Sequence, residues 1–246
     1  MKFERRLRYL RAMFYPMKRT YFFALIFAFA LGSCENTGDK NEANQAASEV
    51  AKVDSLTMKI GEVRMPAEYF EVLKTNIADY MSSNSTGDYA KYVEYVHPGS
   101  FEHDSLKTKL IAELEMYRET GIQQTIRGYD IQFVSESIDD GKYDVSLLVL
   151  NVRHEIILSG MYAENPQSLE SMIRDKYGRD NYTFNPSKPS YDIEGEVKMY
   201  CFAPKGEKRF YFLQDTFVQS PKLAHLMEYP IMKRMKEFEA EYQASR

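Results

Sequence analysis

The sequence has no tryptophan, and only two cysteines and four histidines among its 246 residues. It also lacks an apolar run of about 20 residues, the length that a helix needs to cross a membrane. No glycine-rich phosphate loop, Gly-x-Ser-x-Gly, His-x-x-x-His or Cys-x-x-Cys occurs in it. The spacings typical of P-loop nucleotide enzymes, nucleophile-elbow hydrolases and common zinc sites are therefore missing. We expect neither a cofactor nor a metal ion.

Positive charge is scarce outside the N-terminus. The first 33 residues hold seven Lys and Arg against one Glu, although the whole chain has a net charge of −4. The remaining residues contain 25 Lys and Arg against 35 Asp and Glu, a net charge of −10. Nucleic acid requires clustered basic side chains, so the acidic part of the chain excludes it as a partner.

An apolar run of 11 residues, YFFALIFAFAL, occupies Tyr21–Leu31 and follows Lys18-Arg19. A short apolar segment behind a positive flank is typical of a signal peptide. The pattern is compact if translation starts at Met17 rather than at the first residue printed. In either case we assign residues 1–33 to the signal.

The signal ends in Leu31-Gly32-Ser33-Cys34. This resembles the lipobox of bacterial lipoproteins, in which a leucine and two small residues precede the acylated cysteine. The resemblance implies lipidation of Cys34, a lipid anchor in a membrane, and a place in the bacterial cell envelope, at the outer membrane. The alternative is an ordinary secretory signal with a chance cysteine.

If Cys34 is acylated, Cys201 has no cysteine partner. It lies in the apolar, strand-like run EVKMYCFAP. We interpret it as a buried structural thiol. A nucleophilic role would need a neighbouring base, and the sequence identifies none.

The rest of the chain divides into a tether and one folded domain. Residues 35–64 are polar and have no strong period, so we expect 34–65 to be a flexible, lipidated tether. Apolar periodicity begins after Pro66. We expect a single domain over 66–246 that includes a helical C-terminal tail.

Within this domain the pattern predicts helices first and strands afterwards. The expected helices are 67–82, which the polar stretch Ser82–Asp88 ends, a short one up to His97-Pro98, and one from Asp104 or Ser105 to Gly121. The expected strands are 125–137, 142–158 and a hairpin over 193–217, with a helix inserted at 165–178. Ser220-Pro221 begins the tail, and Pro230 interrupts it.

This order predicts an α+β fold, with N-terminal helices packed on a curved antiparallel sheet, a helical insertion and a C-terminal helix. Two stretches, GDYAKYVEYVHPGSF (Gly87–Phe101) and EVKMYCFAPKGEKRFYFLQD (Glu196–Asp215), resemble envelope lipoproteins of the nuclear transport factor 2-like (cystatin-like cone) superfamily. The resemblance implies a cone-shaped domain that holds ligands between its sheet and helices. Some members are enzymes with an Asp–His pair in the cone, and many are not.

The chain offers few candidates for such chemistry. His154, in a strand-like run, is the best candidate base, and Asp144 shares its strand parity. They are ten residues apart, which is too far along a strand for a direct hydrogen bond. Arg127, Tyr129 and Arg153 are candidates for binding an anionic ligand at the cone mouth, and the alternative is that they are ordinary residues of the sheet face.

Three functions stay open. The favoured one is a lipid-anchored envelope protein whose cone-shaped domain binds a small molecule or an envelope protein without catalysis. The second is an enzyme of the isomerase, cyclase or hydrolase type that uses a pocket histidine and acid. The third is an interaction protein that docks partners through its C-terminal helices.

Overall fold

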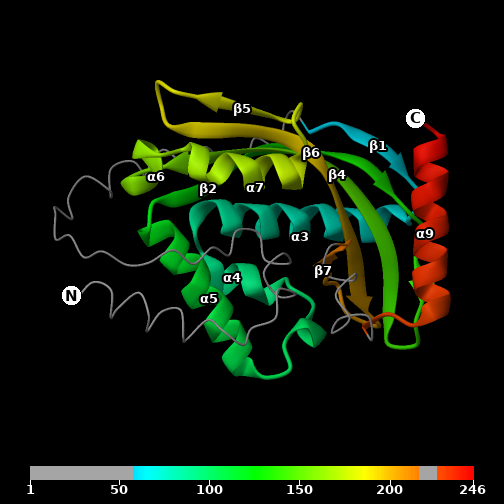
Figure 1. The fold of residues 1–246 in the computed structure, drawn as a ribbon. Coiled ribbons are helices and arrows are strands. Elements are labelled where there is room, and N and C mark those ends of the chain that lie inside the picture. The colour runs from blue at the N-terminus through cyan, green and yellow to red at the C-terminus, as the bar shows by residue number, and fades with distance from the viewer. Residues whose placement is uncertain (1–57, 216–225) are drawn as a thin grey trace. The chain divides into compact units, whose positions relative to one another are not determined.

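The structure is a computed structural model that describes residues 58–215 and 226–246 (Figure 1). The signal peptide, Cys34, the tether up to Thr57 and the expected helix start at Ser220-Pro221 lie outside the described residues. Everything below concerns the described part of the chain.

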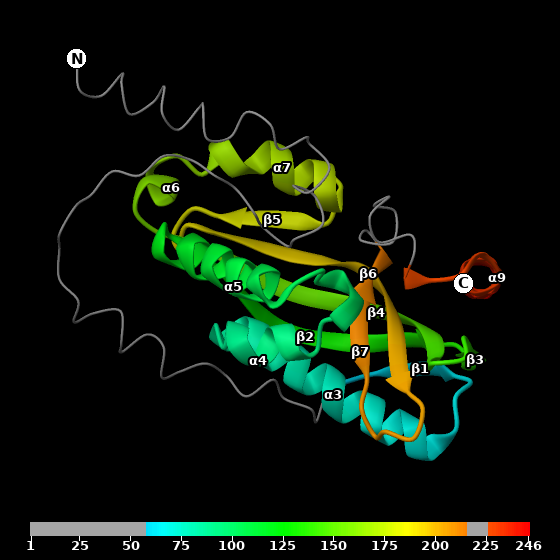
Figure 2. The ribbon, with the colours of Figure 1, turned by 90° about the horizontal axis from the view of Figure 1, so that it is seen from below.

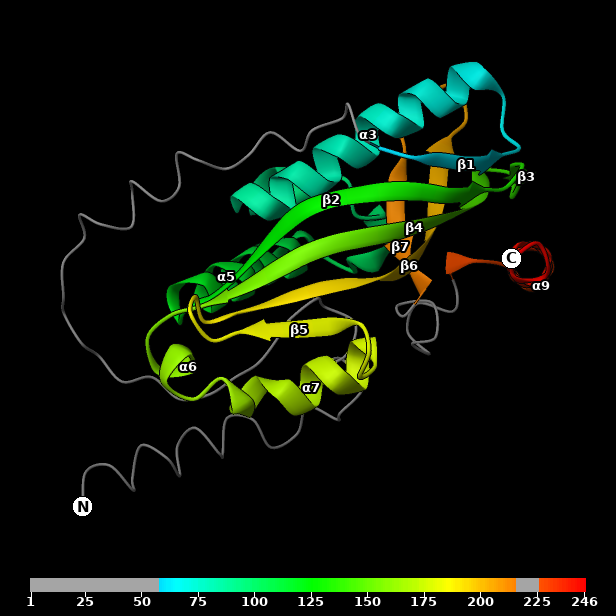
Figure 3. The ribbon, with the colours of Figure 1, turned by 90° about the horizontal axis from the view of Figure 1, so that it is seen from above.

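Seven strands of this part form one strongly curled sheet (Figure 3). Their order is β1-β2-β4-β6-β5, with β3 beside β4 and β7 beside β6. The strands are β1 (Ile60–Val63), β2 (Ile122–Val134), β3 (Ile138–Asp139), β4 (Tyr143–Leu158), β5 (Tyr182–Asn185), β6 (Ser190–Pro204) and β7 (Tyr211–Gln214). Strand β1 runs parallel to β2, and the other neighbours pair antiparallel.

Helices cover the two faces of the sheet unequally (Figures 1 and 2). The helices are α3 (Ala67–Thr86), α4 (Tyr89–Glu94), the 3-10 helix η3 (Pro98–Ser100), α5 (Asp104–Glu119), α6 (Met161–Glu164), α7 (Gln167–Tyr177) and α9 (Tyr229–Ala244). Helices α3, α4, α5 and α7 lie on one side, which we call the helix-covered face. Helix α9 packs at one end of the opposite side, which we call the outer face and on which Leu147 and Arg153 of β4 lie.

Successive residues of the long strands point to opposite faces of the sheet, and both faces carry apolar side chains that form a core. On the helix-covered face, Ile131 of β2, Leu148 and Leu150 of β4 and Met199 of β6 are fully buried. On the outer face, the odd-numbered β4 residues from Tyr143 to Val149 form a core with α9. The apolar stripe of α9 that enters this core consists of Ile231, Met235, Phe238 and Tyr242. These two cores explain why one end of the sheet is apolar on both sides.

The predicted fold class is confirmed: helices pack on a curved sheet, with a helical insertion and a C-terminal helix. Two register shifts in β2, between Ile126 and Gly128 and between Ile131 and Phe133, are β-bulges, which bend a strand and increase its twist. The sheet is mixed rather than wholly antiparallel because β1 joins its edge. We expected these residues in the tether.

Helix α3 runs four residues beyond the predicted end. Its last turn contains Ser83, Asn84 and Ser85, all buried, and the Ser85 hydroxyl accepts a hydrogen bond from the Ile126 backbone at 3.0 Å. Ser85, which we took for part of a helix break, therefore continues the helix and binds the sheet. Gly87, with a φ of 78°, ends the helix.

Pro230 begins a helix rather than interrupting one. It stands in the first turn of α9, where the backbone N–H has no partner within the helix in any case. Strand β5 was not expected at all, because its alternation of aromatic and polar residues, Tyr-Thr-Phe-Asn, is only four residues long.

Candidate ligand-binding site

The space between the sheet and its helices, where the superfamily resemblance places a ligand, is packed with aromatic side chains. The rings of Tyr80 and Tyr92 stack with centroids 4.8 Å apart, and the ring of Phe212 lies 5.1 Å from that of Tyr80. The two tyrosine hydroxyls are 3.1 Å apart. Burial raises the pKa of both phenols, so they stay neutral hydrogen-bonding groups.

His154 and Asp144 lie on the same face of β4, as their parity predicted, but at different ends. His154 pairs with Ile193 of β6, whereas Asp144 pairs with Ala203. About 33 Å of strand separates the two positions. The buried His154 ring packs against Tyr177 of α7, with centroids 5.2 Å apart. The structure therefore does not bring the candidate base and acid together.

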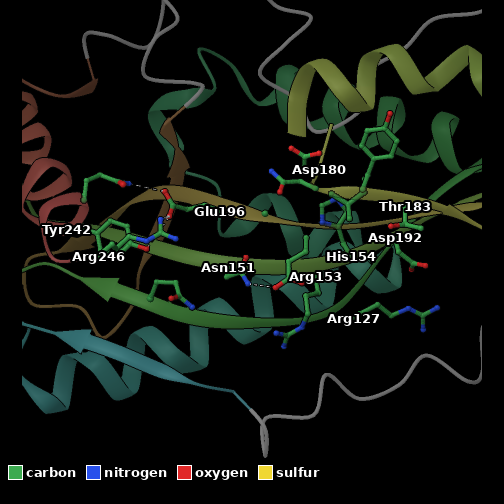
Figure 4. Close-up of a pocket in the computed structure, with 17 residues that line it drawn as sticks. Arg127, Asn151, Arg153, His154, Asp180, Thr183, Asp192, Glu196, Tyr242 and Arg246 are labelled. Atoms are coloured by element: carbon green, nitrogen blue, oxygen red, sulfur yellow. Dashed lines mark hydrogen bonds and ion pairs between the residues drawn. The ribbon is translucent and has the colours of Figure 1, made fainter. Parts of the chain in front are cut away.

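A pocket of about 870 Å³ opens instead on the outer face (Figure 4). Its walls come from β2, β4, β5, β6 and the end of α9, and are mostly polar. The side chains used below are Arg127, Arg153, Asp180, Asp192, Glu194 and Arg246. Helix α9 covers only one end of this face, and the remaining strand surface therefore forms an open hollow.

Two buried carboxylates hold two of the pocket's three arginines in place. Glu155 is paired with Arg127 and, at 2.9 Å, with Lys188. Burial opposes its ionisation, but the hydrogen bonds from its cationic partners outweigh burial and hold the pKa of Glu155 below its usual range. Arg127 stands at the first bulge of β2, where the extra residue changes the direction of the side chain.

Asp130 forms the second pair. Its carboxylate accepts from Arg153 at 2.7 Å and from the Lys59 backbone N–H at 2.9 Å. These bonds outweigh the effect of burial and lower the pKa of Asp130. Tyr129, the neighbouring candidate, is buried on the helix-covered face and does not join the arginines.

The end of α9 closes one side of the pocket. Glu196 of β6 accepts from the Tyr242 hydroxyl at 3.1 Å and pairs with Arg246 at 2.7 Å. Every arginine that lines the pocket thus has a carboxylate partner. Three lining carboxylates, those of Asp180, Asp192 and Glu194, form no ion pair with any side chain that the structure describes, a set that leaves out Lys176. Asn151 donates a hydrogen bond to Glu194 at 2.5 Å.

The sequence carried a signal for these carboxylates that we did not use. Glu194 and Glu196 are acidic at alternate positions of the strand expected from Ile193, and Asp192, directly before it, continues the same spacing, which places all three on one face. The signal for Asp180 is absent, because it depends on the position of the loop before β5.

Among the other candidates, His154 lines the pocket beside Arg153, whereas Asp144 and Cys201 do not. Cys201 is fully buried, and burial raises the pKa of its thiol. Within 58–215 and 226–246, no group of three or more His, Cys, Asp and Glu side chains could hold a metal ion. In the same ranges, no helix has the length and apolar character that crossing a membrane requires.

Comparison with known proteins gives no family assignment: no protein-family model matches the chain, and no curated protein sequence matches it.

Proposed function

We propose that the protein is held in the bacterial cell envelope by a lipid on Cys34, and that it binds a positively charged ligand in the outer-face pocket without catalysis. The lipobox-like end of the signal supports the anchor. Two or three acyl chains hold a protein on a membrane stably without a membrane-spanning helix. The polar pocket supports the binding role.

One observation carries the choice of ligand: the pocket has uncompensated negative charge. Its three arginines are paired to carboxylates, while Asp180, Asp192 and Glu194 face it without a cation among the described residues. An anionic ligand would have to take Arg127 from Glu155 or Arg153 from Asp130, and a buried carboxylate that loses one of its charged partners is costly. A cation meets three carboxylates that have no ion pair with any side chain the structure describes.

The residues that we named for the two alternatives are not arranged as those functions require. An enzyme of the expected kind needs an acid and a base within hydrogen-bond reach, and His154 and Asp144 lie at different ends of β4. A docking role for the C-terminal helix needs its apolar stripe to be exposed. That stripe is buried against the sheet.

Calorimetric titration with spermidine at low salt tests the charge of the ligand. Exposed charge pairs contribute up to about 1 kcal/mol each, so we expect the Asp192→Asn/Glu194→Gln double variant to bind about tenfold more weakly than the unchanged protein. The matched control is Glu115→Gln/Glu119→Gln, which removes two charges from exposed positions on α5. Equal binding by both double variants would contradict the proposal.

Mass spectrometry of the protein purified from bacterial membranes tests the anchor. We expect a mature N-terminus at Cys34 that carries the mass of a diacylglyceryl group, and a Cys34→Ser variant that is unprocessed and unlipidated. An unmodified Cys34 within a longer chain would refute the anchor but not the pocket.

A further inference from the structure

Arg153 of β4 has a candidate carboxylate partner on each neighbouring strand. Glu194 of β6 lies directly opposite it, and opposite residues of antiparallel strands have Cβ atoms about 5 Å apart. On β2, Gly128 lies opposite Arg153, and Asp130 follows on the same face. Arg153 is paired with Asp130 at 2.7 Å, whereas Glu194 accepts a hydrogen bond from Asn151. The choice that Arg153 makes between the two carboxylates therefore sets the charge that the pocket offers to a ligand.

Two features of β2 favour the pair with Asp130. The first is Gly128, where a Cβ would lie 3.0 Å from the Arg153 guanidinium, so the missing side chain leaves room for Arg153 to cross β2. The second is the burial of Asp130, whose two oxygens are held from two sides. One oxygen accepts from Arg153, and the other accepts from the Lys59 backbone N–H at 2.9 Å. A buried carboxylate is stable only with such partners.

The N–H that holds Asp130 belongs to the residue directly before β1. The carbonyl of the same residue, Lys59, accepts from the Ile131 N–H at 3.0 Å, so both of its backbone groups bind β2. Strand β1 has four residues, three of them exposed, and its strand partner is β2 at the edge of the sheet (Figure 3). Short edge segments open at a lower free energy than core strands. The hydrogen bond to Asp130 therefore depends on the least protected strand of the sheet.

Detachment of β1 would change the balance between the two partners of Arg153. Asp130 would lose its backbone donor, and the edge of β2 beside it would meet water, where ion pairs contribute little. Glu194, directly opposite, is then a competing partner for the guanidinium. An Arg153 that turned to Glu194 would add a positive charge to the pocket and neutralise one of its three lining carboxylates.

We propose that β1 regulates cation binding in the outer-face pocket, with Asp130 as the positioning residue that connects the two. While β1 is paired with β2, Asp130 keeps Arg153 away from Glu194 and the pocket accepts a cation. When β1 detaches, Arg153 turns to Glu194 and competes with the cation. This inference rests on the proposed function, because the regulated ligand is the cation of that pocket.

The first test changes the donor to Asp130. Lys59→Pro removes the backbone N–H and keeps the carbonyl that Ile131 uses, and proline is tolerated at the start of an edge strand. Lys59→Gln is the matched control, because it removes the same charge and keeps the N–H. By calorimetric titration at low salt, we expect the proline variant to bind spermidine at least about fivefold more weakly than the glutamine variant. Circular dichroism should show that both variants are folded.

The second test asks whether Arg153 carries the effect. In an Arg153→Gln background no guanidinium can turn to Glu194. We therefore expect Lys59→Pro and Lys59→Gln to bind spermidine equally in that background. A difference that persisted there would come from a change in the fold alone, and it would overturn the positioning role of Asp130.

The third test measures the coupling from the side of the ligand. Coupling between two sites is reciprocal, so a bound cation should stabilise the paired state of β1. We expect saturating spermidine to slow hydrogen exchange of the Ile131 amide at least about fivefold. The Leu106 amide, which bonds to the His103 carbonyl at the start of α5, is the control and should exchange at an unchanged rate. Unchanged exchange of Ile131 would overturn the coupling.

Spermidine binding to the unchanged protein separates this inference from the proposed function. If spermidine binds, and binds Lys59→Pro and Lys59→Gln equally well, the regulation by β1 fails and the pocket stands. If spermidine does not bind the unchanged protein, the proposed function fails and the inference fails with it.

Discussion

His97 is a buried histidine in an aromatic cage. Its ring centroid lies 4.3 Å from that of Phe202 and 5.2 Å from that of Tyr143, and its Nδ1 accepts from the Gly99 N–H at 3.1 Å. Burial, with a smaller contribution from the charge of Lys142, lowers the pKa of His97 to about 4. A neutral imidazole is therefore part of the folded state.

This burial predicts a loss of stability in acid. The folded-state pKa lies below the unfolded value of about 6.5, so the contribution is fully present above pH 6.5 and is lost as the pH falls towards 4. Between pH 7 and pH 4.5 it amounts to about 2 kcal/mol. Urea unfolding at both pH values should show this extra loss relative to His97→Asn, which keeps an acceptor for Gly99. An equal pH dependence in both proteins would rule out a neutral buried His97.

Cys201 is a second buried titratable residue, and its burial makes the thiol unreactive. Its side chain has no exposed surface, and burial raises the pKa of the thiol, whereas thiol chemistry requires an accessible thiolate. In a Cys34→Ser protein we expect no reaction with 5,5′-dithiobis(2-nitrobenzoate) in native buffer and one equivalent in denaturant. Ser105→Cys, at an exposed position, is the positive control. Rapid labelling of Cys201 in native buffer would contradict its structural role.

At the scale of elements, the sequence predicted the long ones well because their signals are long. The periodicity after Pro66 identified α3, and the apolar run around Val149 identified β4. Short elements depend on partners that are distant in the sequence. Strands β1 and β5 have four residues each, and only their pairing with β2 and β6 makes them strands.

Strand β1 supplies an element-scale prediction through Gly61. A Cβ at this position would lie 2.2 Å from the Gln132 carbonyl oxygen, so Gly61→Ala has to push β1 away from β2. We expect hydrogen exchange of the Ile131 amide, which donates to the Lys59 carbonyl at 3.0 Å, to become at least tenfold faster. The stability should fall by about 1–2 kcal/mol. Gly195→Ala is the control, since its nearest contact, Tyr177, is 3.8 Å away.

At the scale of the whole molecule, the sequence could not say which face of the sheet is free. Helix α9 covers the outer face at Tyr143–Val149 and leaves it open at Asn151 and Arg153. This choice depends on where along the sheet α9 packs, and no local pattern encodes it. The candidates Arg127 and Arg153 were therefore found by residue type, but their ion pairs and their separation from Tyr129 were not.

The distribution of buried side chains gives a prediction for the whole chain. All the core residues that the structure describes fall between Met65 and Tyr242, so residues 58–246 contain that core complete. We expect this fragment and a 34–246 chain with Cys34→Ser to unfold at the same urea concentration. Their m-values should also agree, because the m-value scales with the surface exposed on unfolding.

The matched comparison is a chain that stops at Glu228. It loses α9 and with it four side chains of the outer-face core, among them the fully buried Phe238. Removing buried side chains of this size costs about 2–5 kcal/mol each, so this chain should be unfolded or unfold at much lower urea. If instead the 58–246 fragment were the less stable one, residues before Met58 would have to pack on the domain, and the division into tether and domain would be wrong.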